Sequence, residues 1–316
     1  MPEGPVAEIV SLAVLAESLG YDRCWVYDEG LATRDVYVTM TAIAVATSRI
    51  EIGPGITNAY TRHPATTAAA IASVDELSGG RAFLGVGAGG SLTLGPLAVD
   101  RSKPLTAVRE LVSMCRSLFS GGATNTVGSI GTLANATLAF ARPELPIWLA
   151  GRGPKMLALG GELADGVMLD FLDEQSIEAA IDLVSGGAAQ TKNSPRICYS
   201  TLVVTDQDSL DLVRPHMTYR LVDSQPAVRD RIGLSDDDRE SIREAMSDGL
   251  EAAGRLVKDE WVLPFVIAGS EVECAKQIRR LHTQFGIEEF MLPVLDLPSA
   301  ADYVARVARV LDQARS

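Results

Sequence analysis

Cysteine and histidine are scarce in this chain, and their positions exclude the commonest metal and redox motifs. The 316 residues include four cysteines and three histidines. No two cysteines are close enough to form a CxxC pair, which argues against a zinc ribbon and a redox dithiol. The dispersed histidines form no HExxH motif. We therefore expect no metal site, and we interpret the cysteines as small, buried apolar side chains.

Positive charge is also in short supply. Lysine and arginine number 28 against 41 acidic residues, which gives a formal net charge of −13. Such a charge repels nucleic acid phosphates and anionic lipid surfaces. No apolar run is long enough to span a membrane, and the N-terminus lacks the basic start and apolar core of a signal peptide. We expect a cytoplasmic protein with neither a nucleic acid nor a membrane as partner.

Short apolar runs alternate with longer amphipathic stretches along the whole chain, a pattern typical of repeated βα units with a buried parallel sheet. Seven runs are predicted to be strands, at residues 23–27, 50–53, 82–86, 146–150, 166–169, 197–204 and 289–294. Helical patterns occupy, among others, residues 7–19, 36–46, 64–77, 105–118 and 272–284. The sequence predicts an α/β fold, a TIM (β/α)8-type barrel with loop insertions, as one domain over residues 1–316.

One of the eight strands of such a barrel has no counterpart in the sequence. The chain begins almost directly in its first helix, where Pro2, Gly4 and Pro5 argue against a preceding central strand. We expect the first strand to be missing or truncated. Two longer connections are predicted insertions: residues 121–142 as a loop, and the charged residues 223–259 as short solvated helices.

Glycines gather at the end of the third predicted strand and include Gly85, Gly87, Gly89 and Gly90. They let the backbone approach a flat or charged group at the carboxyl end of the barrel, where barrel enzymes place their active sites. The same residues spell GxGxxG, the fingerprint of a dinucleotide-binding fold. A helix would then begin within the glycines, whereas a loop follows here. We therefore interpret them as part of a barrel mouth.

A second segment that suits a ligand follows a later strand and comprises Ala150, Gly151, Arg152, Gly153 and Pro154. The free N–H groups and the positive dipole end of a helix that opens at a proline favour a phosphate. The side chain of Arg152 adds positive charge. A tight turn between strand and helix explains the same residues equally well.

Three side chains are candidates for proton transfer. Asp28 and Glu29 end the run CWVYDE, and a carboxylic acid at the mouth can donate or accept a proton. Neighbouring residues of a strand point to opposite faces, so only one of the two would face the mouth. His63 is the third candidate, and a structural role beside Pro64, in packing or capping, is as well supported as catalysis.

Several motifs together resemble the bacterial luciferase-like superfamily, and most closely its coenzyme F420-dependent methylenetetrahydromethanopterin reductases. They are WVYDE, TRDVYVT, IGPGITNAYTRHP, SGGRAFLGVGAGG, IWLAGRGPKM and ADGVML, in that order. The resemblance implies a barrel that moves a hydride to or from a deazaflavin, with FMN as the alternative cofactor. It also implies a non-prolyl cis peptide at Gly55–Ile56, a cofactor ring near Thr57, Asn58 and the glycines at 87–90, and its phosphate near residues 150–153.

The sequence also departs from the reductase pattern. Gly90 stands where these reductases usually carry an acid, and Asp28–Glu29 stands where Asp-His is common. Asp170 falls near the expected phosphate, which a carboxylate would repel. Three hypotheses follow: an F420-dependent oxidoreductase acting on a small organic substrate, an FMN-dependent luciferase-like monooxygenase, and a cofactor-free barrel protein.

A homodimer is also expected, because relatives often form one. The apolar helix residues Ala42, Ile43 and Val45 are compatible with a dimer interface and equally with packing on the sheet.

Overall fold

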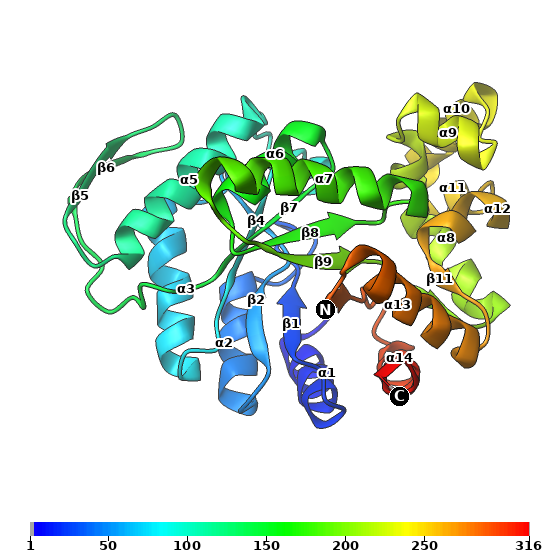
Figure 1. The fold of residues 1–316 in the computed structure, drawn as a ribbon, viewed down its shortest axis with the longest axis horizontal. Coiled ribbons are helices and arrows are strands. Elements are labelled where there is room, and N and C mark those ends of the chain that lie inside the picture. The colour runs from blue at the N-terminus through cyan, green and yellow to red at the C-terminus, as the bar shows by residue number, and fades with distance from the viewer. Residues whose placement is uncertain (1–2, 316) are drawn as a thin grey trace.

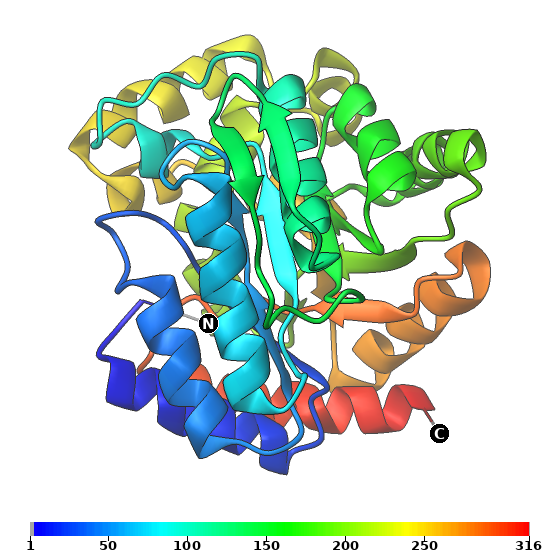
Figure 2. The same ribbon diagram turned by 90° about the vertical axis from the view of Figure 1, so that its left-hand side faces the viewer.

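The computed structural model describes residues 3–315 and consists of a parallel barrel with helices packed around it (Figures 1 and 2). The barrel strands are β1 (Arg23–Val26), β2 (Glu51–Pro54), β3 (Thr57–Asn58), β4 (Leu84–Gly87), β7 (Ile147–Gly151), β8 (Gly166–Asp170), β9 (Arg196–Ser200) and β12 (Glu289–Met291). All their pairings are parallel, in the order β12-β9-β8-β7-β4-β3 and β1-β2. A single bridge between Ile52 and Ala82 joins β2 to the start of β4. The predicted α/β barrel is confirmed.

The strands β2 and β3 are two halves of one barrel strand, which is interrupted at Gly55–Ile56. Counted in this way, residues 3–315 form seven barrel strands. The sheet ends at β1 on one side and at β12 on the other. The helix α1 (Val6–Ser18) precedes β1, and no strand comes before it among residues 3–315.

Most helices cover the outside of the barrel, and several begin where the sequence predicts. They include α2 (Val36–Ala46), α3 (Pro64–Ser78), α5 (Pro104–Phe119), α6 (Pro154–Leu163), α7 (Glu174–Thr191), α13 (Glu271–Phe285) and α14 (Ala300–Arg315). Local chemistry sets these boundaries. The Asp35 carboxylate accepts hydrogen bonds from two N–H groups at the start of α2, and Ser270 and Glu273 form a capping box on α13. Glycines in the left-handed conformation end α3 and α13.

The interior of the barrel is filled with large side chains. Trp25, Phe83 and Trp148 stack edge to face, with centroid distances of 4.5 Å between Trp25 and Phe83 and 5.7 Å between the two tryptophans. The guanidinium of Arg23 lies 4.5 Å from the centroid of Trp148. Because the barrel is a packed core and not a pore, a substrate site is expected at its carboxyl-end mouth.

Two predictions of local structure are wrong in detail. The predicted strand 197–204 divides into β9 and the short β10 (Val203–Val204), and β10 leaves the barrel to pair with β11 (Ile267–Ala268). The predicted loop 121–142 contains an antiparallel hairpin of β5 (Thr124–Val127) and β6 (Thr132–Ala136). The alternation of apolar and polar side chains predicts which residues of a strand are buried, but it does not predict which strand pairs with it. Neither outcome could therefore be predicted from the local sequence pattern.

The second insertion consists of short helices, as predicted. They follow α8 (Gln207–Val222) and are α9 (Pro226–Ile232), α10 (Asp236–Ala245), the 3-10 turn η1 (Met246–Asp248), α11 (Leu250–Gly254), α12 (Asp259–Val262) and the 3-10 turn η2 (Leu263–Phe265). Their inner faces share a core around Leu221, Ile242 and Trp261, beside the barrel in Figure 1. Only their outer faces are therefore solvated. Among the described residues, no helix has the length and apolarity needed to cross a membrane.

Candidate functional site

The carboxyl ends of neighbouring strands bring the predicted ligand-binding segments to one rim. Asn58 pairs with Gly87 in the β3–β4 ladder, and β4 in turn pairs with β7. Ala150 pairs with Met168 between β7 and β8. The glycine turn after β4 and the turn after β7 are therefore adjacent in space, although they lie about sixty residues apart in the sequence.

The peptide between Gly55 and Ile56 is cis, as the family resemblance implied. The Ile56 side chain lies over β4: a Cβ added to Gly87 would be 2.0 Å from Ile56 Cδ1. A Cβ on Gly85 would be 2.1 Å from the Pro54 carbonyl oxygen. Both glycines are therefore required because the segment that joins β2 to β3 lies so close to β4.

The glycines that leave space for a ligand are different ones. Ideal Cβ atoms on Gly90 and Gly153 would meet nothing within 4 Å. Gly89 has a φ of +75°, and its position is close to Leu94 at the end of the short helix α4 (Ser91–Leu94). Gly89 therefore makes the turn, whereas Gly90 and Gly153 leave bare backbone that an incoming group can approach.

Asp28 and Thr57 form a buried pair at the mouth. The Thr57 hydroxyl donates a hydrogen bond of 2.7 Å to Asp28 Oδ2. The Asp28 side chain is nearly inaccessible, with 8% of the residue exposed, and Thr57 is fully buried. Burial raises the pKa of Asp28, and the Thr57 hydrogen bond and the positive charge of Arg62 oppose that shift in part. A carboxyl group in this setting holds its proton to higher pH than an ordinary aspartate.

Neither Glu29 nor His63 takes part in this hydrogen-bonded pair. Burial raises the pKa of Glu29, and the negative charges of Glu3 and Asp28 add to the shift. His63 is exposed, and its Nδ1 accepts the Ala65 N–H at 3.2 Å as the cap of α3. Its ring packs beside Gly131 in the β5–β6 hairpin. The sequence left two roles open for His63, helix capping and catalysis, and the structure places it in the capping position.

Asn58 has a structural task within the same loop. Its side-chain oxygen accepts the N–H groups of Tyr60 at 2.9 Å and of Thr61 at 3.1 Å. This Asx turn fixes the backbone that leaves β3. Asn58 therefore shapes the rim through its side chain while its backbone continues the ladder to β4.

A charged cluster that the sequence did not predict lies at the ends of β7, β8 and β9. The Asp170 carboxylate is 3.6 Å from Arg152 Nε and 3.8 Å from Arg220 Nη1, and it accepts a hydrogen bond of 3.1 Å from the Ser200 hydroxyl. Arg220 also donates to the Asp170 carbonyl oxygen. Burial lowers the pKa of Arg220 to about 10, which leaves it charged at neutral pH.

Two guanidinium groups thus face one carboxylate at this cluster, and its net charge is positive. The repulsion of a phosphate that Asp170 alone would cause is therefore offset. Arg220 belongs to α8, fifty residues after Asp170, and no local motif marks it. Only the tertiary structure reveals this partner.

Comparison with known proteins places the chain in a family. Residues 1–288 match the model of the family described as luciferase-like monooxygenase, and the chain belongs to that family. It is 33% identical over 292 residues to a 5,10-methylenetetrahydromethanopterin reductase of Archaeoglobus fulgidus, covering 89% of this chain and 88% of that protein. A reductase of the same name from Methanolobus tindarius is 32% identical with the same coverage of both chains.

Solved structures agree with this assignment. The coenzyme F420-dependent tetrahydromethanopterin reductase of Methanopyrus kandleri superposes with a TM-score of 0.87 at 26% identity, over 97% of this chain and 95% of that chain. An F420-dependent secondary alcohol dehydrogenase, solved with an F420–acetone adduct, has a TM-score of 0.79 at 20% identity, covering 99% and 96% of the two chains. At that identity the second likeness concerns the fold alone.

Proposed function

We propose that this protein is an F420-dependent oxidoreductase that transfers a hydride between the deazaflavin and a small organic substrate. The observation that carries the proposal is the 33% identity, over most of both chains, to a 5,10-methylenetetrahydromethanopterin reductase. The open mouth supports it, because bare backbone lies beside a cationic cluster there. A one-carbon unit on a pterin-like carrier is the substrate class that these relatives suggest.

The residues at the mouth fit such a cofactor. Gly55 and Ile56 are half-buried and, together with the exposed Gly90, offer a surface for the ring, whereas Thr57 is fully buried. The start of α6 at Gly153 and Pro154, flanked by Arg152 and the Arg220 cluster, suits a phosphate on its tail. The bound deazaflavin would supply the hydride chemistry, and the protein would supply binding and orientation.

We assign the proton-handling role to Asp28. Its raised pKa lets the carboxyl hold its proton to higher pH than an ordinary aspartate, which suits the group to donate a proton to the substrate. Thr57 would position the carboxyl through its hydrogen bond. Glu29 is retained as a second candidate acid, whereas the cap that His63 makes on α3 leaves its Nδ1 occupied.

Titration of the purified chain with F420 and, separately, with FMN tests the cofactor assignment. We expect saturable changes in the absorbance or fluorescence of F420 and none with FMN. Saturable binding of FMN alone would replace the proposal with the luciferase-like monooxygenase hypothesis. A correctly folded sample that binds neither would instead support the cofactor-free hypothesis.

We also propose that the protein acts in the cytoplasm as a homodimer. The exposed apolar residues of α2 support a dimer: Val45 is 72% exposed and Val38 61% exposed, whereas Ile43 is fully buried and is excluded from an interface. Light scattering of the purified chain at several concentrations tests this state. A mass of 33.6 kDa throughout would show a monomer.

A further inference from the structure

The two arginines that face Asp170 at the mouth are held very differently. The Arg220 side chain is 11% exposed, donates to the Asp170 carbonyl oxygen and lies 5.7 Å from the ring centroid of Phe265. The Arg152 side chain is 52% exposed, and its Nε is 3.6 Å from the Asp170 carboxylate. Among residues 3–315, none accepts a hydrogen bond from Arg152. Arg220 is therefore fixed, whereas every guanidinium N–H donor of Arg152 is available to a ligand.

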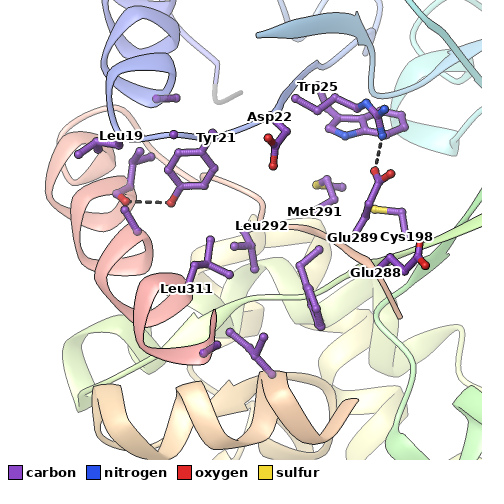
Figure 3. Close-up of a pocket in the computed structure, with 18 of the residues that line it drawn as sticks. Leu19, Tyr21, Asp22, Trp25, Cys198, Glu288, Glu289, Met291, Leu292 and Leu311 are labelled. Carbon is purple, nitrogen blue, oxygen red and sulfur yellow. Dashed lines mark hydrogen bonds and ion pairs between the residues drawn. The ribbon is translucent and has the colours of Figure 1, made fainter. Parts of the chain in front are cut away.

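A second acid that lies between two arginines shows how a closed arrangement differs. Glu289 accepts a hydrogen bond from Arg23 and forms an ion pair with Arg196. It lies where β12 and β9 begin, beside the cavity drawn in Figure 3, and neither Arg152 nor Asp170 lines that cavity. The 3.6 Å contact of Asp170 with Arg152 exceeds the usual N–H···O hydrogen-bond distance of about 2.7–3.2 Å. Asp170 therefore neutralises Arg152 without satisfying its donors.

The surroundings of Arg152 favour an anion other than Asp170. Asp173, the next acid along the chain, is 5% exposed and accepts a hydrogen bond of 2.7 Å from Arg231, so it does not compete for Arg152. Gly153, which follows Arg152, is the N-cap residue of α6 and makes no side-chain cap. The N–H groups of the first turn of α6 therefore add to the positive charge of Arg152.

We propose that Asp170 is an exchangeable counter-ion, which pairs with Arg152 in the free protein and releases it to the phosphate of the bound cofactor. This inference rests on the proposed function and assigns roles to two residues of that site. Hydrogen bonds from a guanidinium to a phosphate are stronger than a loose ionic contact, which favours the exchange. Because Arg220 stays beside Asp170, the displaced carboxylate keeps a positive partner.

The exchange predicts an effect of opposite sign for the two partners. Asp170 competes with the phosphate for Arg152, so Asp170→Asn should strengthen binding of the cofactor and Arg152→Gln should weaken it. The asparagine retains an acceptor for the Ser200 hydroxyl, which lies 3.1 Å from Asp170 Oδ1. The bond from Arg220 to the main-chain carbonyl of residue 170 is also unaffected. Asp170→Asn is therefore expected to fold normally.

Fluorescence titration of the full chain with F420, and with the deazaflavin riboside that lacks the phosphate tail, tests this inference. The measured quantity is the ratio of the riboside Kd to the F420 Kd. Asp170→Asn should raise the ratio by about threefold or more, the worth of one exposed ion pair. Arg152→Gln should lower it by about tenfold or more, because charge-assisted hydrogen bonds are lost. The matched control is Asp173→Asn, which removes the same charge beside Arg231 and should leave the ratio unchanged.

A lower ratio in Asp170→Asn would mean that Asp170 orients Arg152 for the phosphate, and an unchanged ratio would mean that the two do not exchange. Either result would overturn the inference while F420 binding upheld the proposed function.

Inorganic phosphate provides a test that does not depend on the cofactor. The NMR signal of the Arg152 Nε–H group is identified by its loss in Arg152→Gln. We expect phosphate to shift this signal saturably, at a concentration about threefold lower in Asp170→Asn than in the parent. If this result holds and F420 does not bind, the proposed function fails and the exchange stands. A signal that phosphate leaves in place in both proteins would overturn the exchange.

Discussion

At the scale of single residues, Asp28 is expected to support the activity of the protein at a cost to the stability of its fold. Because its folded-state pKa is raised, its neutral form is favoured in the folded protein, and the resulting stability is lost as the pH rises through that pKa. An asparagine keeps an acceptor for the Thr57 hydroxyl but cannot ionise. Asp28→Asn should therefore remove the free-energy cost of ionising a buried carboxyl group, and it should also remove the proton that this group would transfer.

We predict that Asp28→Asn lowers kcat by about 10²-fold or more, which is the usual effect of losing a general acid or base. Its free energy of unfolding at pH 8 should be equal to or higher than that of the parent protein. Urea denaturation and steady-state rates measure the two effects. A variant that is fully active would show that Asp28 does not transfer the proton.

Thr57→Val provides the matched substitution. The Thr57 hydrogen bond lowers the pKa of Asp28, so its removal should raise that pKa further. If Asp28 must be protonated, activity in the variant should persist to higher pH than in the parent. The pH dependence of kcat/KM measures this shift, and an unchanged profile would contradict the assigned role.

The four cysteines are all free and buried. Burial raises the pKa of Cys24 to about 11 and that of Cys198 to about 12. Thiolates are the reactive species, so we predict that a thiol reagent labels none of the four in the native protein and all four in urea. Mass spectrometry counts the labels, and rapid native labelling would show that local opening exposes a cysteine.

At the scale of elements, the close contact of α6 with α7 depends on glycine. A Cβ on Gly187 would lie 1.9 Å from the Ala158 carbonyl oxygen, whereas a Cβ on the neighbouring Gly186 would meet nothing within 4 Å. Both residues lie in α7, so their helix propensities are the same. They therefore form a natural pair for separating propensity from packing.

We predict that Gly186→Ala stabilises the protein by about 0.5–1 kcal/mol, because alanine is the better helix former. Gly187→Ala should destabilise it by about 1–3 kcal/mol through overpacking against backbone. Chemical denaturation of both variants measures the difference. Stabilisation by both would mean that α6 and α7 can move apart at little cost.

At the scale of the whole molecule, cofactor binding should couple to stability. A ligand that binds only the folded state stabilises it by about 2.7 kcal/mol at a concentration of 100 times its Kd. We predict that F420 raises Tm by several degrees in a concentration-dependent manner and that FMN does not. Thermal denaturation with each compound measures this, and a Tm raised by FMN alone would favour the monooxygenase.

The sequence by itself determined the βα rhythm and the two glycine segments that lie at the mouth. Periodicity, caps and glycine positions are local properties, and they gave bounds within a residue or two for helices such as α2 and α3. The tertiary structure alone decided that Asp28 pairs with Thr57, that Arg220 joins Asp170 and that β10 leaves the barrel. Those outcomes depend on which strands become neighbours and in which register. Contacts between residues that are far apart in the sequence leave no local pattern in the chain.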